Sequence, residues 1–220
     1  MIINKISDKN NIKIITKQYL EYLDTGALPS EILVLSFNSN SKKNIEKNIS
    51  ICDIGAGSGN ISITLKKIFE DFENVDITAI EISEKAIEVI KKNEENILKT
   101  NINIINAEAL TFVPEKKFDI IVSNPPYVAL KDKDNLQKDL GFEPETALYS
   151  GYDGLDFYRK FLSVIDKYLK IGGVFFFEIG FNQGEELLNI CKSFGIKNAM
   201  VKKDLSGKDR FLICYNFMYV

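Results

Sequence analysis

From residue 49 onward, short runs of consecutive apolar residues alternate with segments in which apolar residues recur at helical spacing. The runs expected to be strands are Ile49–Ile54, Val75–Ile80, Ile102–Ile105, Phe118–Val122 and Val174–Ile179, with two more near Ala199–Lys202 and Phe211–Phe217. Continuous apolar strands that alternate with helices are typical of a parallel sheet covered on both faces. The alternation therefore predicts an α/β fold with a mostly parallel, seven-stranded sheet and helices on both faces.

The segments between these runs carry the periodicity of amphipathic helices. They are Ile61–Phe69, a helix that begins after Ser83, one helix through Leu155, Tyr158, Leu162, Ile165 and Leu169, and a helix around Leu187–Phe194. Ser83 is expected to cap the second helix, whose inner stripe would be Ala86, Ile90 and Ile97. Gly172-Gly173 are expected to end the third helix. Because such sheets bind ligands at the carboxyl ends of their strands, the chemistry should follow directly after strands.

The stretch before the first predicted strand is harder to assign. Residues 1–48 are expected to form a shortened N-terminal helical or linker segment, with a short helix at Ile12–Leu23, followed by one domain over residues 49–220. No apolar stretch near the N-terminus is long enough for a signal peptide, and no run of about 18 apolar residues occurs. We therefore expect a cytoplasmic protein without a membrane partner.

Composition excludes some classes of chemistry. The net charge of -3 differs from the strongly basic balance typical of nucleic-acid-binding proteins. Three widely spaced cysteines fit neither a disulfide framework nor a zinc pattern, so we expect free thiols and no bound metal. The chain contains no histidine, which excludes an imidazole base or ligand.

A glycine-rich loop follows the first predicted strand. Its residues are Asp53, Ile54, Gly55, Ala56, Gly57, Ser58 and Gly59. Alternating glycines permit a tight turn and a close approach to a ligand. The spacing departs from a dinucleotide fingerprint at Asn60, and no Gly-Lys-Ser/Thr follows as in a P-loop. The loop is similar to that of class I methyltransferases, where it wraps the methionine end of S-adenosyl-L-methionine; a glycine turn without a ligand is the alternative.

Acidic residues follow the second and third predicted strands. Glu81 is placed where a carboxylate can accept two hydrogen bonds from a ribose diol, although it could serve only the dipole of the next helix. Glu108 and Ala109 follow the third strand. In methyltransferases of this fold the corresponding turn lies beside the adenine, whose amino group Glu108 could bind; a solvated loop acid is the alternative.

The segment Asn124-Pro125-Pro126-Tyr127 follows the fourth predicted strand. A planar amide or amino nitrogen has a delocalised lone pair, so it needs acceptors for its two N–H bonds more than a strong base. The Asn124 side-chain oxygen and the Pro125 carbonyl could be those acceptors, held rigid by two prolines. Tyr127 offers an aromatic face for the planar group. The segment predicts methyl transfer to a planar NH2; in isolation it would be read as a Pro-Pro turn with a capping Asn.

Taken in order, several motifs resemble the protein-(glutamine-N5) methyltransferases that modify peptide-chain release factors. They are Asp53–Gly59, Phe118–Tyr127, Phe142–Leu148, Gly151–Leu155 with Tyr158-Arg159, Gly172-Gly173, Glu178–Gly180 with Gln183, and Lys203–Arg210. The resemblance runs from about Ile51 to Phe211. Asn-Pro-Pro-Tyr alone would not separate glutamine from adenine methylation, and the Phe142–Leu148 block is the discriminating feature.

The resemblance implies a Rossmann-like class I methyltransferase fold, S-adenosyl-L-methionine as cofactor and S-adenosyl-L-homocysteine as product. The implied acceptor is the glutamine of a Gly-Gly-Gln motif in a release factor, the expected partner of a monomeric enzyme. The implied cofactor contacts are Asp53, Gly55, Ala56, Gly57, Ser58, Gly59, Glu81, Glu108, Ala109 and Asn124. The residues implied to hold the glutamine amide, as the catalytic set, are Asn124, Pro125, Pro126 and Tyr127.

The sequence departs from the family pattern at three places. Position 81 usually carries Asp, and position 109 often carries a large aromatic residue near the adenine. Family members have a larger N-terminal helical domain that helps to dock the release factor. Here Leu28-Pro29-Ser30-Glu31 resembles the Arg-Pro-Glu-Thr segment after that domain, without its Arg.

Two alternatives stay open. One is an amino methyltransferase that acts on adenine or guanine in nucleic acid, which the net charge of -3 and the lack of room for a target-recognition domain do not favour. The other is a catalytically inactive, shortened paralogue that binds a partner, against which the intact Asn124–Tyr127 segment argues.

Overall fold

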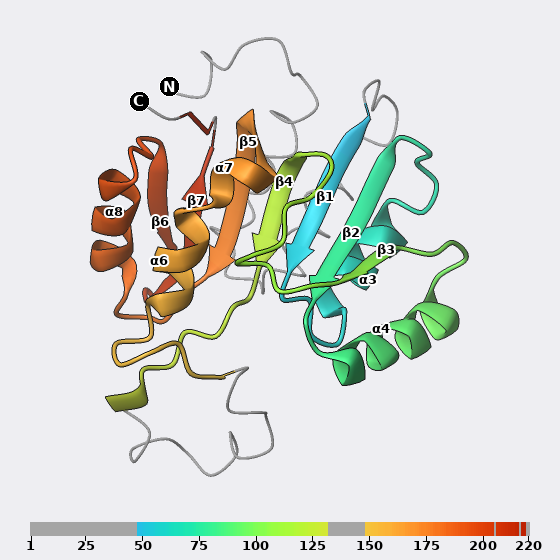
Figure 1. Cartoon of the computed structure of the whole chain (residues 1–220), viewed down its shortest axis with the longest axis horizontal. Coiled ribbons are helices and arrows are strands. Elements are labelled where there is room, and N and C mark those ends of the chain that lie inside the picture. The colour runs from blue at the N-terminus through green and yellow to red at the C-terminus, as the bar shows by residue number, and fades with distance from the viewer. Residues whose placement is uncertain (1–47, 132–147, 205, 216, 219–220) are drawn as a thin grey trace.

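A seven-stranded sheet with the strand order β3-β2-β1-β4-β5-β7-β6 forms the centre of the computed structural model (Figure 1). The structure describes residues 48–131, 148–204, 206–215 and 217–218. The strands are β1 (Ile49–Ile54), β2 (Val75–Glu81), β3 (Asn103–Asn106), β4 (Phe118–Ser123), β5 (Leu169–Glu178), β6 (Ala199–Lys203) and β7 (Asp209–Cys214). β1 to β5 pair in parallel, and β7 is antiparallel to both β5 and β6. The predicted mostly parallel, seven-stranded sheet is confirmed.

Helices cover both faces of this sheet, as predicted. They are α3 (Asn60–Ile68), α4 (Glu84–Ile97), α6 (Asp156–Leu162), α7 (Ile165–Tyr168) and α8 (Gly184–Ser193). One core cluster joins the strands to α3 and α4, and a second joins them to α6, α7 and α8. Ile51 belongs to the first cluster and the next residue, Cys52, to the second. This alternation follows from the period of two along a strand and explains why the strands are apolar on both faces.

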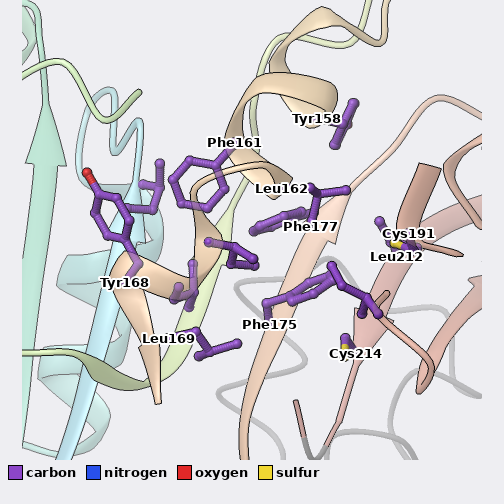
Figure 2. Packing of buried hydrophobic residues seen from close by; sticks show 14 of the residues in the cluster. Tyr158, Phe161, Leu162, Tyr168, Leu169, Phe175, Phe177, Cys191, Leu212 and Cys214 are labelled. Carbon is purple, nitrogen blue, oxygen red and sulfur yellow. The ribbon is translucent and has the colours of Figure 1, made fainter. Parts of the chain in front are cut away.

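The second cluster contains several aromatic rings that contact one another, among them Phe161, Phe175 and Phe177 (Figure 2). The Phe175 and Phe177 rings of β5 stack with centroids 4.7 Å apart. Phe161 of α6 meets Phe177 edge-on at 5.7 Å and Tyr168 of α7 at 5.2 Å. These contacts fix α6 and α7 on β5, whose carboxyl end reaches the candidate site.

The single helix predicted through Leu169 is wrong. The chain forms two shorter helices, α6 and α7, which are separated at Ser163-Val164, and Leu169 already begins β5. The Ser163 hydroxyl donates to the Lys160 carbonyl, a local bond that competes with helical pairing. Gly172-Gly173 do not end a helix but lie inside β5, where the pairing register with β4 shifts. Gly172 has a φ of 78°, so the glycine pair accommodates a bulge.

The inner stripe predicted for α4 is partly wrong. Ser83 does cap α4, since its side chain accepts a hydrogen bond from the Ala86 N–H. Ile90 is buried as expected, but Ile97 is 47% exposed. The buried positions are Ile87, Ile90 and Glu94. Glu94 takes the inner position because its carboxylate accepts a 2.6 Å hydrogen bond from the Ile102 N–H, just before β3.

Two segments for which the sequence makes predictions are not described by the structure. The helix at Ile12–Leu23 and residues 142–147 of the discriminating block lie outside the described residues. In the described ranges, no helix has the length and apolar character needed to cross a lipid bilayer.

Candidate active site

The glycine loop joins the end of β1 to α3 and is anchored to the end of β2. The N–H groups of Gly55 and Ala56 both donate to the Ile80 carbonyl, at 2.9 and 3.2 Å. Gly55 and Gly57 have φ of 65° and 57°, and a Cβ added at either would meet nothing within 4 Å. A Cβ at Gly59 would come within 3.1 Å of Ile90 on α4. Gly59 therefore serves the packing of α3 on α4, whereas the space beside Gly55 and Gly57 is open.

Glu81 bridges the glycine loop and the entrance to α4. Its carboxylate is buried, with Oε2 accepting from the Gly57 N–H at 2.7 Å and Oε1 from the Ser83 N–H at 2.8 Å. A carboxylate oxygen can accept two hydrogen bonds, so each oxygen retains capacity for a further donor. The geometry is compatible with a diol contact and shows that Glu81 also shapes the loop.

Asp53 is buried at the end of β1, two residues before Gly55. Its Oδ2 accepts from the Ser62 N–H in the first turn of α3 at 3.0 Å, while Oδ1 has no hydrogen-bond partner in the described structure. Burial raises the pKa of Asp53 to about 7, although the bonds from Ser62 oppose the shift. An unpartnered buried carboxylate oxygen is a site that a cationic group on a ligand can satisfy. Asp53 Oδ1, an acceptor close in sequence to the open glycines, therefore fits the donating ammonium group at the methionine end of S-adenosyl-L-methionine.

The turn after β3 is held in place by hydrogen bonds from a tyrosine of α7. Glu108 is exposed, and its carboxylate accepts from the Leu110 N–H at 3.1 Å. Ala109 is buried in the second core cluster, and its carbonyl accepts from the Tyr168 hydroxyl at 2.7 Å. The same hydroxyl donates to the Phe112 carbonyl at 2.9 Å. Tyr168, to which the sequence assigned no role, thus fixes the Glu108-Ala109 turn.

The Asn124–Tyr127 segment leaves β4 beside the glycine loop. The Ser123 hydroxyl donates to the Ile54 carbonyl at 2.6 Å and ties the ends of β4 and β1 together. Asp53 pairs with Val122, and continuing this register places Asn124 next to Gly55. Asn124 is exposed, and among the described residues its side-chain amide has no hydrogen-bond partner. Its oxygen is therefore available to a ligand next to the open glycines.

Tyr127 is fixed at both its backbone and its hydroxyl. The Tyr127 carbonyl accepts from Gln183 Nε2 at 2.9 Å, and the hydroxyl donates to Glu178 Oε1 at 3.4 Å. Glu178 ends β5, and Arg210 Nη1 lies 3.6 Å from its Oε1. Burial raises the pKa of Glu178, while Arg210 and Tyr127 oppose that shift. The structure thus brings Asn124–Tyr127, the glycine loop and Glu81 to one edge of the sheet.

Three supporting residues carried no assigned role at the sequence level: Ser123, Tyr168 and Gln183. Gln183 belongs to one of the family motifs, but two of its partners, Tyr127 and Gly154, are distant in sequence. Glu178 could have been predicted as a site residue from the sequence, because it lies near the end of an apolar run, at the edge of the sheet where the other polar residues are found.

The sequence pattern of the methyltransferase domain family matches residues 45–210. Among curated proteins, the release factor glutamine methyltransferase of Flavobacterium psychrophilum is 37% identical over 188 residues, which cover 83% of this chain and 64% of that protein. The release factor glutamine methyltransferase of Clostridium acetobutylicum is 36% identical, covering 86% of this chain and 65% of that protein. This chain thus spans just under two thirds of these relatives.

Solved structures show the same fold at low identity. A SAM-dependent methyltransferase from Aquifex aeolicus gives a TM-score of 0.56 at 16% identity, covering 95% of this chain and 98% of that one. TrmN from Thermus thermophilus gives a TM-score of 0.55 at 16% identity, covering 91% of this chain and 53% of that one. At this level of identity the likeness concerns the fold alone.

Proposed function

Because the chain belongs to the methyltransferase domain family, we propose that it transfers a methyl group from S-adenosyl-L-methionine to the glutamine amide of the Gly-Gly-Gln motif in a peptide-chain release factor. One observation carries the proposal: the register that pairs Asp53 with Val122, continued by two residues, places Asn124, whose amide is free among the described residues, next to Gly55 of the open loop. The similarity to relatives named release factor glutamine methyltransferase supports glutamine as the acceptor.

The residues divide into two groups in this proposal. Asp53, the loop from Gly55 to Gly59, Glu81 and the Glu108-Ala109 turn hold the cofactor. When bound, S-adenosyl-L-methionine supplies an electrophilic methyl group on a sulfonium, and S-adenosyl-L-homocysteine is the product. Asn124 also borders the cofactor through its position beside Gly55.

The second group holds the acceptor nitrogen. The Asn124 side-chain oxygen and the Pro125 carbonyl accept the two amide N–H bonds and so orient the nitrogen, while the Tyr127 ring lies against the planar amide. The nitrogen needs no strong base, because its proton can leave to solvent after the N–C bond has formed. The absence of histidine from the chain is compatible with this chemistry.

The test is transfer of labelled methyl from S-adenosyl-L-methionine by the purified chain to a release factor, with the modified residue located by mass spectrometry. We expect the label on the Gly-Gly-Gln glutamine. We also expect Asn124→Ala to lower kcat by about a hundredfold, the typical cost of removing one preorganised acceptor or donor. Labelled RNA or DNA with unlabelled release factor would favour the nucleic-acid alternative. Cofactor binding without any transfer would favour an inactive paralogue.

A further inference from the structure

The turn between β5 and α8 holds a buried glutamine that is bonded to three separate backbone groups. Gln183 is 7% exposed. Its Oε1 accepts from the Gly180 N–H at 2.8 Å, and its Nε2 donates to the carbonyls of Tyr127 at 2.9 Å and Gly154 at 3.3 Å. One end of the amide faces a donor and the other faces two acceptors. The hydrogen-bonding partners therefore define the orientation of the amide.

Close backbone packing surrounds this amide. A Cβ added to Gly154, whose φ is 80°, would lie 2.3 Å from the Tyr127 carbonyl oxygen and 2.7 Å from Gln183 Nε2. A Cβ on Gly180 would lie 2.9 Å from Gln183 Cδ. Two glycines thus allow three chain segments to meet around one side chain, at distances that other residues could not reach without displacement. Gln183 joins the acceptor-holding segment, the Gly151–Leu155 segment and the β5–α8 turn.

The β5–α8 turn and the end of β5 hold Tyr127 at two points. Gln183 binds the Tyr127 carbonyl, and Glu178, five residues earlier, accepts from its hydroxyl. The 2.9 Å bond to the backbone is the stronger restraint on Tyr127, and the 3.4 Å contact of the hydroxyl is a weaker second one. Because Pro125 and Pro126 restrict the preceding backbone, this restraint extends to Asn124.

We propose that Gln183 is a positioning residue for methyl transfer: it holds the Asn124–Tyr127 segment at its working distance from the glycine loop without touching the substrate or the cofactor. The inference rests on the proposed function. It extends that function by assigning the order of the acceptor-holding segment to one buried amide in the turn between β5 and α8.

Gln183→Glu tests this assignment because its effect depends on pH. The ionised carboxylate would face the Tyr127 and Gly154 carbonyl oxygens, whereas the protonated carboxyl can again donate to one of them. Charged groups on the neighbouring elements act on the introduced carboxyl. The negative charges of Glu178 and Asp209 favour its protonated form, and the positive charge of Arg210 favours its ionised form. We expect the kcat of the variant relative to wild type to fall about tenfold or more at pH 8.5, and to recover to within about threefold at pH 6. The KM for the cofactor should stay within about twofold.

Asn189→Asp is the matched control, because Asn189 is exposed on α8, the helix that follows Gln183, and undergoes the same change from amide to carboxylate. Its relative kcat should not depend on pH. Hydrogen exchange gives a second readout: backbone amides of residues 127–131 should exchange faster in Gln183→Glu than in Asn189→Asp at pH 8.5, while residues 55–62 should not differ.

A relative kcat of Gln183→Glu that does not change with pH, or unchanged exchange in residues 127–131, would overturn the assignment. If the wild-type chain itself transfers no methyl to a release factor, the proposed function fails instead. The exchange comparison then still decides whether Gln183 orders the segment.

Discussion

Asp53 is a buried acid whose pKa is raised because its carboxyl is removed from water. One carboxylate oxygen is bonded to the Ser62 N–H and the other has no partner in the described structure. Burial raises its pKa from 3.8 to about 7, so the folded chain holds this proton more tightly than the unfolded chain does. The resulting contribution to stability is complete below the unfolded pKa and is lost as the pH rises through about 7.

Asp53→Asn should therefore raise the free energy of unfolding relative to wild type more at pH 8 than at pH 5. Because the folded carboxyl titrates near pH 7, the change between pH 5 and pH 8 covers about two pH units and corresponds to at most about 3 kcal/mol. Urea unfolding of the ligand-free chain at both pH values measures the difference. The same substitution should weaken S-adenosyl-L-methionine binding, because the anionic oxygen is lost. A stability difference that is equal at pH 5 and pH 8 would contradict the pKa assigned to Asp53.

Residue types and their positions after strands predicted Glu81 and Asn124 as site candidates, the resemblance added Asp53, and the structure brings the three to one edge. The supporting bonds could not be predicted in the same way. Gln183 acts on a carbonyl 56 residues earlier, and Tyr168 acts on carbonyls 59 and 56 residues earlier. Such pairs depend on which strands are neighbours, and apolar periodicity does not specify that order.

At the scale of elements, the amino ends of β1, β4 and β5 are joined by a polar cluster opposite the candidate site. Asp119 Oδ2 accepts from the Ser50 N–H at 3.1 Å, from the Ser50 hydroxyl at 2.8 Å and from Lys170 Nζ at 2.7 Å. The Asp119 side chain is 8% exposed, and that of Lys170 is 40% exposed. A buried carboxylate with three donors is a strong link between strands, whereas the half-exposed lysine is partly screened by solvent.

Asp119→Ala should destabilise the chain by about 3 kcal/mol, the usual cost of removing one partner from a buried charged cluster. Lys170→Met should cost about 1 kcal/mol or less, because Ser50 still satisfies the carboxylate. Urea unfolding of both variants at pH 7 gives the comparison. Below its unfolding transition, Asp119→Ala should retain the wild-type kcat, since the cluster lies at the opposite edge of the sheet. Equal losses for the two variants would refute this ranking.

Apolar runs predicted the strands well because the central strands β1, β2 and β4 are buried on both faces, while the edge strands β3 and β6 are only partly covered. Helical spacing was less informative between Leu155 and Leu169, because α6 and α7 bury residues at intervals that one continuous helix would also produce. The glycine pair at 172–173 is compatible with either a helix end or a strand bulge. The competing pairing with β4, which decides between them, is a long-range property.

At the scale of the whole molecule, the candidate cofactor residues lie at or just after the ends of β1, β2, β3 and β4, so ligand binding should stabilise the fold as a unit. At a free concentration of S-adenosyl-L-homocysteine about 100 times its Kd, the gain should be about 2.7 kcal/mol. Thermal unfolding with and without this ligand measures it. Asp119→Ala is a suitable control, because it should unfold at a lower temperature and still show the full ligand-induced increase. No increase for the wild-type chain would argue against cofactor binding.

The antiparallel β7 lies between β5 and β6, and this order has a consequence for synthesis on the ribosome. Until β7 is made, the edge of β5 along Phe175–Glu178 lacks its native partner. Residues 179–208 must be translated first, which takes about 2 to 6 s at ordinary elongation rates. During that interval a nascent chain with three adjacent phenylalanines presents an open strand edge, the kind of surface that chaperones shield and that pairs with other chains.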